Sequence, residues 1–130
     1  MSVFLERPVS DHIASNDLAF AIFDGFPVSP GHALLVPRRV VPTWFDATRE
    51  EQSALMALID DVKRVLDARF KPDGYNIGIN AGVAAGQTVM HVHVHLIPRY
   101  HGDVPDPRGG IRHLIPGKGN YLIPPRPASD

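Results

Sequence analysis

The sequence predicts an α+β domain in which one long helix covers an antiparallel sheet. Short apolar runs at residues 18–23, 32–36, 75–80 and 91–97 have the length and bounding turn residues of strands. One longer run, residues 48–70, repeats apolar side chains every three or four positions. The chain has 130 residues, 44% hydrophobic and 21% charged, which fits one soluble domain with a single core.

The first two apolar runs are expected to pair as an antiparallel hairpin. Residues 18–23 lie between the turn-forming pairs 16–17 and 24–25, and Pro37 ends the second run. The connecting residues 25–31 contain two glycines and two prolines. A seven-residue loop therefore joins the two strands.

The helix prediction is the strongest of the local assignments. Thr48 and Glu51 have the spacing of a capping box. Residues 71–74 end the helix and lead into the third strand, which a small-residue loop at 81–88 connects to the fourth. The apolar stripe expected to face the sheet consists of Leu55, Leu58, Ile59, Val62, Leu66 and Phe70.

Composition excludes several classes of partner. Thirteen Lys and Arg residues against fourteen Asp and Glu give a net charge of −1, so no basic field attracts nucleic acid or an anionic membrane. The first 17 residues lack the apolar core of a secretory signal, and no run approaches a membrane span. Cysteine is absent, which is compatible with a reducing compartment. We expect a cytoplasmic protein without nucleic-acid or membrane partners.

The domain is expected to span residues 1–130, with residues 100–130 as an irregular tail rich in Gly, Pro and Arg. Only residues 111–115 and 121–123 of this tail have the composition of short extended pieces. Arg99, Arg108, Arg112 and Lys118 could screen distal phosphates of a ligand or contact a second subunit. An equally good interpretation of the tail is an irregular segment whose arginines are exposed to solvent and contact no ligand.

The run from 91 to 97 carries the chemistry. In a strand, His91, His93 and His95 would point to one face while the intervening aliphatic residues point to the other. Same-face neighbours in a strand are roughly 6.5–7 Å apart. Such a row suits a substrate with several negative charges in a line, or a metal ion.

Two uses of the row remain open from the residues alone. Crowded imidazoles lower one another's tendency to protonate, so a neutral nucleophile can stand beside a proton donor. Alternatively, the three imidazoles could hold zinc, with His32 as a further ligand. Against the metal, the row has no nearby carboxylate and its outer members are widely spaced.

The chain resembles the histidine-triad (HIT) superfamily of nucleotide hydrolases and transferases. The resemblance covers roughly residues 10–100 and depends on residues 26–37, which include Pro30-Gly31-His32, on Asn80, and on residues 86–97 with Gly-Gln-Thr ahead of the triad. It implies a HIT-like fold, an antiparallel sheet of about five strands with one long helix and a short one packed on it. Homodimers are usual in this family, so the resemblance also implies a homodimer.

The resemblance assigns the catalytic group. His93 would attack the α-phosphorus of a nucleotide and form a covalent nucleotidyl-histidine, which water then hydrolyses. His95 would contact the phosphate and help protonate the departing group. His91 and His32 would support and orient the row.

The resemblance also assigns substrate contacts. Gln87 and Thr88 match positions that bind phosphate or the departing group, and Asn80 matches a polar position nearby. Asp24 matches the residue that holds the ribose hydroxyls. Ile13 and Ile22 align with the apolar base pocket, for which adenine is the usual occupant in the family.

The third position of the triad is His95, which favours hydrolysis over transfer to phosphate or another acceptor. Residues 26–32 and 85–88 resemble the fragile-histidine-triad branch, so diadenosine tri- or tetraphosphate is the expected kind of substrate. Alternatives are a nucleoside phosphoramidate hydrolase, which Asp24 favours, a metal-dependent hydrolase that uses the histidine row, and a weakly catalytic nucleotide sensor. We expect no resident metal or cofactor, and any divalent cation to arrive with the substrate phosphates.

Overall fold

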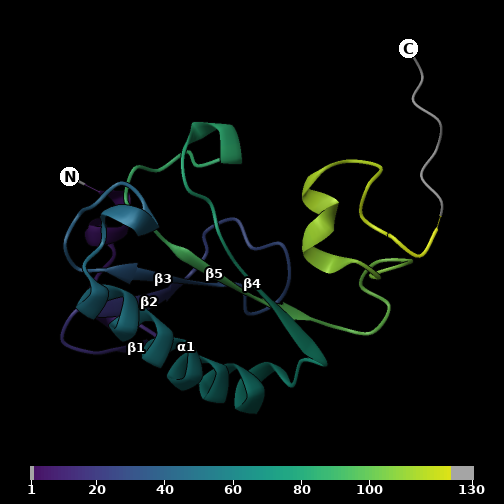
Figure 1. Ribbon diagram of the computed structural model, residues 1–130. Helices are drawn as coiled ribbons and strands as arrows, with labels where there is room; N and C mark the ends of the chain where they lie inside the picture. The colour runs from purple at the N-terminus through teal and green to yellow at the C-terminus, as the bar shows by residue number, and fades with distance from the viewer. Residues whose placement is uncertain (1, 124–130) are drawn as a thin grey trace. The chain divides into compact units, whose positions relative to one another are not determined.

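The computed structural model describes residues 2–123, which form two compact units that divide after Arg99 (Figure 1). The first unit contains a five-stranded sheet in the order β1-β2-β3-β5-β4, and every neighbouring pair is antiparallel. The strands are β1 (Ala14–Ser15), β2 (Ala19–Phe23), β3 (Ala33–Pro37), β4 (Gly74–Ile79) and β5 (Val94–Arg99). The predicted α+β class and antiparallel sheet are confirmed.

The long helix α1 (Arg49–Phe70) covers one face of this sheet (Figure 1). Thr48 and Glu51 form the predicted capping box, each side chain accepting a hydrogen bond from the other residue's backbone N–H. Lys71 then adopts a left-handed conformation with φ 51° and ends the helix. The other helical segments are 3₁₀ turns: η1 (Val3–Glu6), η2 (Val9–Asp11), η3 (Trp44–Asp46), η4 (Val83–Ala85) and η5 (Gly110–Leu114).

The main core lies between α1 and the sheet. Small alanines on β2 and β3 and larger side chains on the central strands meet the apolar stripe of the helix. The fully buried members are Ala19, Ala21, Ala33, Leu35, Leu55, Leu58, Val62, Leu66 and Val94. Ile59 and Leu66 belong to the same cluster, so the predicted stripe faces the sheet as expected.

The opposite face of the sheet has its own, smaller core. Phe20, Ile22, Leu34 and Val36 point away from α1, and Phe4 from η1 packs against them. This N-terminal turn therefore closes part of the face that also carries His95, because His95 lies opposite Leu34 in the β3–β5 register.

The histidine strand is shorter than predicted. β5 begins at Val94, so His91 and His93 precede it rather than extend its row. The backbone N–H of Val92 bonds to the carbonyl of Val41 at 2.9 Å, outside the sheet. The segment at 91–93 is thus held by the loop that follows β3, and the expectation of three equivalent imidazoles in one strand is wrong.

The second unit, residues 100–123 as far as the structure describes it, consists of turns. Residues 110–114 form the 3₁₀ helix η5, with Arg112 N bonded to the Gly109 carbonyl, and Ile123 N closes a turn on the Asn120 carbonyl. The two extended pieces predicted at 111–115 and 121–123 are therefore wrong. Local i to i−3 hydrogen bonds replace the ladder that an extended piece would need.

Within residues 2–123, no helix combines the length and apolar character required to cross a bilayer.

Candidate active site

The site begins where β3 and β5 lie side by side. His32 immediately precedes β3, and His95 is the second residue of β5. Their rings meet through a 3.0 Å contact between His32 Nε2 and His95 Nδ1. His93 approaches from the segment ahead of β5, with its ring centroid 5.1 Å from that of His95. The structure therefore brings together three of the four histidines assigned to catalysis.

His93 has one occupied and one available ring nitrogen. Its Nδ1 lies 2.9 Å from the carbonyl oxygen of His91, and a carbonyl only accepts hydrogen bonds, so Nδ1 carries the proton. No residue in the described range 2–123 hydrogen-bonds to Nε2. The Nε2 lone pair of a neutral His93 is consequently free to act as a nucleophile.

A relay of hydrogen bonds sets the opposite tautomer in His95. The backbone N–H of Val28 donates to His32 Nδ1 at 3.1 Å, which leaves the His32 proton on Nε2. That N–H donates to His95 Nδ1, so the proton of a neutral His95 is on Nε2. His93 and His95 thus present an acceptor and a donor, respectively.

Burial favours the neutral form of the His95 and His32 rings. Desolvation, together with the neighbouring His93 and His32 and against the opposing Asp24 carboxylate, lowers the pKa of His95 to about 4. Desolvation also lowers the pKa of His32, again against the Asp24 carboxylate. The crowding effect expected from the sequence acts in this direction, although burial is the larger cause.

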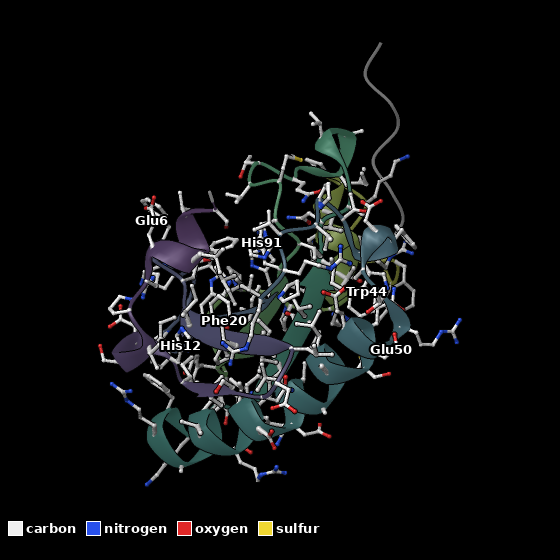
Figure 2. All side chains as sticks on the ribbon, turned by 90° about the vertical axis from the view of Figure 1, so that its left-hand side faces the viewer. Glu6, His12, Phe20, Trp44, Glu50 and His91 are labelled. Carbon is white, nitrogen blue, oxygen red and sulfur yellow. The ribbon has the colours of Figure 1, made fainter. Side chains whose placement is uncertain are left out.

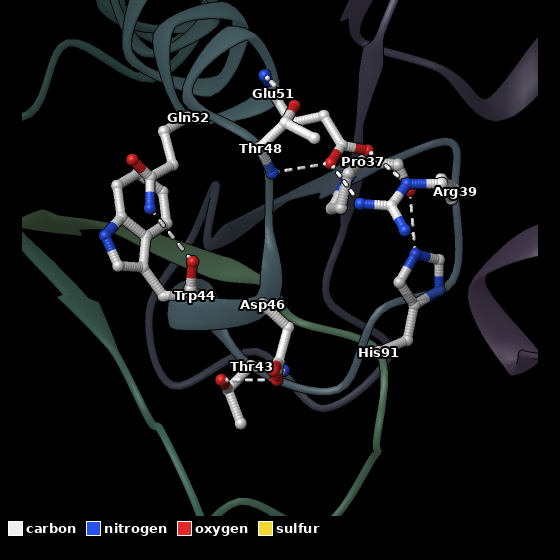
Figure 3. A network of polar contacts seen from close by, with 9 residues as sticks. All are labelled: Pro37, Arg39, Thr43, Trp44, Asp46, Thr48, Glu51, Gln52 and His91. Carbon is white, nitrogen blue, oxygen red and sulfur yellow. Dashed lines mark hydrogen bonds and ion pairs between the residues drawn. The ribbon is translucent and has the colours of Figure 1, made fainter.

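His91 differs from His93 and His95 because both of its ring nitrogens are occupied. Nδ1 lies 2.6 Å from the Ser2 hydroxyl, and the residue is 1% exposed. Nε2 lies 2.7 Å from the Pro37 carbonyl (Figure 3). Its ring therefore takes no part in a three-histidine metal site with His93 and His95. These two hydrogen bonds hold the His91 ring in place, and its supporting role in the site stays a prediction.

Asp24 lies next to the paired histidines. One carboxylate oxygen accepts the backbone N–H of Phe26 at 2.8 Å, and the other lies 3.4 Å from His32 Nε2. Asp24 and His32 also line a cavity of about 540 Å³ at the hairpin loop. The remaining lining residues are Phe23, Pro27, Val28, Ser29, Pro30, Gly31, Arg69 and Phe70. This placement leaves the carboxylate able to meet a polar ligand.

The structure gives Gln87 a different task from the one assigned by the sequence. Its Nε2 donates to the carbonyls of Pro42 and Val89, and its Oε1 accepts from Gly82 N. Both amide N–H groups are thereby committed, and the side chain is 3% exposed. Gln87 braces its loop from within, so the phosphate contact expected of its side chain is not available without rearrangement.

The other two polar positions retain accessible groups. Thr88 follows Gln87 and is exposed. Asn80 directly follows β4 and is half-buried. Within residues 2–123, no hydrogen-bond partner engages the Asn80 side chain.

Ile13 and Ile22 pack on opposite faces of the sheet. Ile13 packs against the core under α1, whereas Ile22 belongs to the cluster on the opposite face and is 1% exposed. Their joint assignment to a base pocket stays a prediction. Alternating strand residues face opposite sides of a sheet, and the face of a residue placed ahead of the very short β1 cannot be read from the sequence pattern.

Sequence reasoning missed the N-terminal contribution. The Phe4 ring lies edge-on to His93 with centroids 5.0 Å apart, and Ser2 contacts His91 across 89 residues of chain. His12 stacks on Phe20 at 4.6 Å on the same face of the sheet (Figure 2). No periodicity or motif in the first twelve residues indicated these contacts, because they depend entirely on tertiary structure.

Comparison with known proteins agrees with this geometry. The model of the HIT domain matches residues 7–102. The chain belongs to the HIT family. A bis(5'-nucleosyl)-tetraphosphatase [asymmetrical] from Schizosaccharomyces pombe is 47% identical over 101 residues, 77% of this chain and 56% of that protein. A bis(5'-adenosyl)-triphosphatase from Dictyostelium discoideum is 41% identical over 90 residues, 69% of this chain and 60% of that protein. This HIT chain thus spans less than two thirds of the length of these relatives.

Solved structures share the HIT fold. A zinc-bound histidine triad family protein from Mycobacterium smegmatis superposes with a TM-score of 0.69 at 32% identity, covering 80% of this chain and 79% of that one. In the present chain, Asp24, His32 and His95 are the described residues able to group around a metal, with ligand atoms all within 4.8 Å of one another. Two imidazole nitrogens and a carboxylate suit zinc, but a cation there would displace the proton that His32 shares with His95.

The low pKa of His95 predicts acid sensitivity of the HIT fold. Its pKa rises from about 4 in the folded protein to the ordinary 6.5 on unfolding, so the unfolded chain binds the proton first as the pH falls. We expect the unfolding free energy to decrease by about 1–2 kcal/mol from pH 7 to pH 5 because of His95. Urea unfolding at both pH values measures this change. The variant His95→Asn should lose that part of the dependence, and an unchanged dependence would contradict the assignment.

Proposed function

We propose that this protein is a nucleotide hydrolase that attacks the α-phosphorus of dinucleoside polyphosphates, diadenosine tri- or tetraphosphate being the expected substrates. The observation that carries the proposal is the His93 ring, whose Nδ1 proton is held by the His91 carbonyl while Nε2 has no partner among residues 2–123. Two relatives whose names specify hydrolysis of such compounds, at 41% and 47% identity, support the substrate class.

The reaction would proceed in two steps. His93 Nε2 forms a bond to the α-phosphorus, the bond from that phosphorus to the bridging oxygen breaks, and the remainder of the substrate leaves as a nucleotide anion. The positive charge that develops on the imidazole is stabilised by the Nδ1–H bond to the His91 carbonyl. A water oxygen then bonds to phosphorus while the bond between His93 Nε2 and phosphorus breaks, which releases a nucleoside monophosphate and one proton and restores neutral His93.

His95 would act as a hydrogen-bond donor through Nε2. In the free protein its pKa of about 4 leaves it almost wholly neutral at pH 7. A phosphate-type leaving group, with a second pKa of about 6, departs without needing a full proton. An amine leaving from a phosphoramidate must first be protonated, which a neutral imidazole does poorly. A neutral His95 therefore fits a leaving group that departs without a full proton, as a polyphosphate supplies.

The remaining assignments complete the proposal. Asp24 would accept hydrogen bonds from the ribose hydroxyls, and Asn80 and Thr88 would meet the phosphates from the loop between β4 and β5. A divalent cation would enter with the substrate phosphates, and the protein would need no resident metal or cofactor of its own. We further propose a cytoplasmic homodimer, by analogy with the family.

The proposal is tested by specificity constants. Purified protein is incubated with diadenosine triphosphate, diadenosine tetraphosphate and an adenosine phosphoramidate, and kcat/KM is measured for each. We expect the better polyphosphate to exceed the phosphoramidate by at least about 100-fold, equivalent to about 2.7 kcal/mol of transition-state binding. The reverse order would assign the site to phosphoramidates. Saturable binding with turnover of none of the three would instead indicate a nucleotide sensor.

A further inference from the structure

The N-terminal turn lies on the same face of the sheet as the nucleophile. Ser2 and Phe4 lie at this turn, and each is 8% exposed although the neighbouring Val3 and Leu5 are 54% and 38% exposed. Figure 2 shows the turn, marked by Glu6, beside His91. The two buried side chains point inward and the remaining ones outward, so the turn is anchored at Ser2 and Phe4.

The Ser2 hydroxyl makes two hydrogen bonds of defined direction. Its oxygen accepts the backbone N–H of Phe4 at 3.2 Å, which caps η1. His91 Nε2 must carry a proton, because its partner is the Pro37 carbonyl at 2.7 Å. Nδ1 of a neutral His91 is therefore an acceptor, and the Ser2 O–H donates to it at 2.6 Å.

His91 is consequently clamped from both sides. The Ser2 hydroxyl fixes one edge of the ring. The Pro37 carbonyl at the end of β3 fixes the other edge (Figure 3). Just beyond Pro37, Arg39 forms a bidentate ion pair with Glu51 in the first turn of α1, at 2.7 and 3.2 Å. The clamp thus connects the N-terminal turn to the part of the structure that is tied to the long helix.

The clamp acts on the proposed nucleophile by two routes. The His91 carbonyl accepts the Nδ1 proton of His93, so the orientation of residue 91 determines where His93 Nε2 points. The Phe4 ring also lies edge-on to His93, with centroids 5.0 Å apart, and 5.8 Å from the His91 ring. The N-terminal turn, remote in sequence, thereby contacts both His91 and the His93 ring that the His91 carbonyl orients.

We propose that Ser2 is a positioning residue for His93, acting through the His91 ring, and that Phe4 holds the His93 ring in the same arrangement. The proposal rests on the function proposed above, in which His93 attacks phosphorus. Without the Ser2 hydroxyl, His91 Nδ1 becomes a buried acceptor with no donor, and the ring must turn or change tautomer to regain one. Either change removes a contact that anchors residue 91, whose carbonyl orients His93.

The kinetic test compares Ser2→Ala with Ser2→Thr, which keeps the hydroxyl. We expect Ser2→Ala to lower kcat by about 10- to 100-fold while KM stays within about twofold, because a displaced nucleophile loses rate rather than substrate affinity. Ser2→Thr should regain most of kcat. Ser10→Ala, at an exposed serine of η2, is the matched control and should leave kcat unchanged.

A spectroscopic test does not depend on turnover. Long-range ¹H–¹⁵N spectra of the histidine rings report which nitrogen carries the proton. In the unaltered protein we expect a single Nε2–H form for His91 and a single Nδ1–H form for His93. In Ser2→Ala, checked by thermal unfolding to be folded, His93 should show a mixture of forms, and Phe4→Leu should show the same change more weakly.

These measurements separate the two proposals. Folded Ser2→Ala with unchanged kcat and an unchanged His93 spectrum would overturn the positioning role and leave the proposed hydrolase intact. A loss of thermal stability with normal kcat per folded molecule would reduce Ser2 to a helix cap and would likewise overturn it. If the unaltered protein hydrolyses no nucleotide, the proposed function fails, and the spectra alone then decide whether Ser2 orients His93.

Discussion

His93→Ala is expected to abolish nucleotide hydrolysis while nucleotide binding survives. The substitution removes the only ring nitrogen in the site that is both unpartnered and held as an acceptor, among the residues that the structure describes. His95 cannot replace it, because its Nδ1 lone pair is taken by His32 and its Nε2 carries the proton. We expect a loss of kcat of at least about 10⁴-fold, as for other variants that lack a covalent nucleophile.

Binding should change little, because His93 is 9% exposed and offers the bound substrate mainly its reactive nitrogen. The dissociation constant of a slowly hydrolysed dinucleoside polyphosphate, measured by calorimetry, should remain within about threefold. His113→Ala, at an exposed histidine in the second unit, is the matched control. Mass spectrometry of acid-quenched single turnovers should detect a nucleotidyl adduct in the unaltered protein and none in His93→Ala. Retention of full activity by His93→Ala would exclude nucleophilic attack by this residue.

The elements that could be predicted from the sequence are those with a local cause. The capping box at Thr48 and Glu51 determines where α1 begins, and the spacing of its apolar residues determines which face meets the sheet. The hairpin of β2 and β3 follows from two apolar runs separated by turn residues. Pairing across that hairpin also places Asp24 beside His32, which the sequence indicated only through the family resemblance.

The parts that could not be predicted have causes distant in the chain. The strand pattern of residues 91–97 is regular, yet Val92 bonds to Val41 and removes His91 and His93 from the ladder. Gln87 has a side chain of the type that contacts ligands. Its amide nitrogen instead donates to the carbonyl of Pro42, 45 residues away. Side-chain type indicates what a group can do, whereas the tertiary partners decide whether that group is still available.

The tautomers of the site illustrate the same distinction. Three histidines in a row indicate an acid, a base or a metal ligand, and nothing in the row itself selects among these roles. The selection is made by Val28 N, by the His91 carbonyl and by the Pro37 carbonyl, which are backbone groups without a sequence signature. Backbone groups of this kind are why identical side chains acquire different roles in one site.

Leu35→Ala is expected to be strongly destabilising, by about 3–4 kcal/mol in unfolding free energy. Leu35 is fully buried at the centre of β3, with Ala21 opposite it on one side and Val94 on the other. Cavities cost most where the surroundings cannot collapse. Ala19, Ala21 and Ala33 have side chains too short to fill the cavity. The capping box at the start of α1 and the left-handed Lys71 at its end hold the helix in place over the cavity.

Urea unfolding at pH 7 measures this cost, and a decrease in melting temperature of about 10 °C should accompany it. Leu18→Ala is the matched control, since Leu18 is 39% exposed just ahead of β2 and its loss should cost less than about 1 kcal/mol. Because Leu35 faces α1 while His32 and His95 face the other side of the sheet, kcat per folded molecule should be unchanged at a temperature where the variant remains folded. Equal losses of unfolding free energy for the two leucine variants would show that the core around the three alanines does relax. A lowered kcat would show that packing between α1 and the sheet affects the position of the histidines on the opposite face.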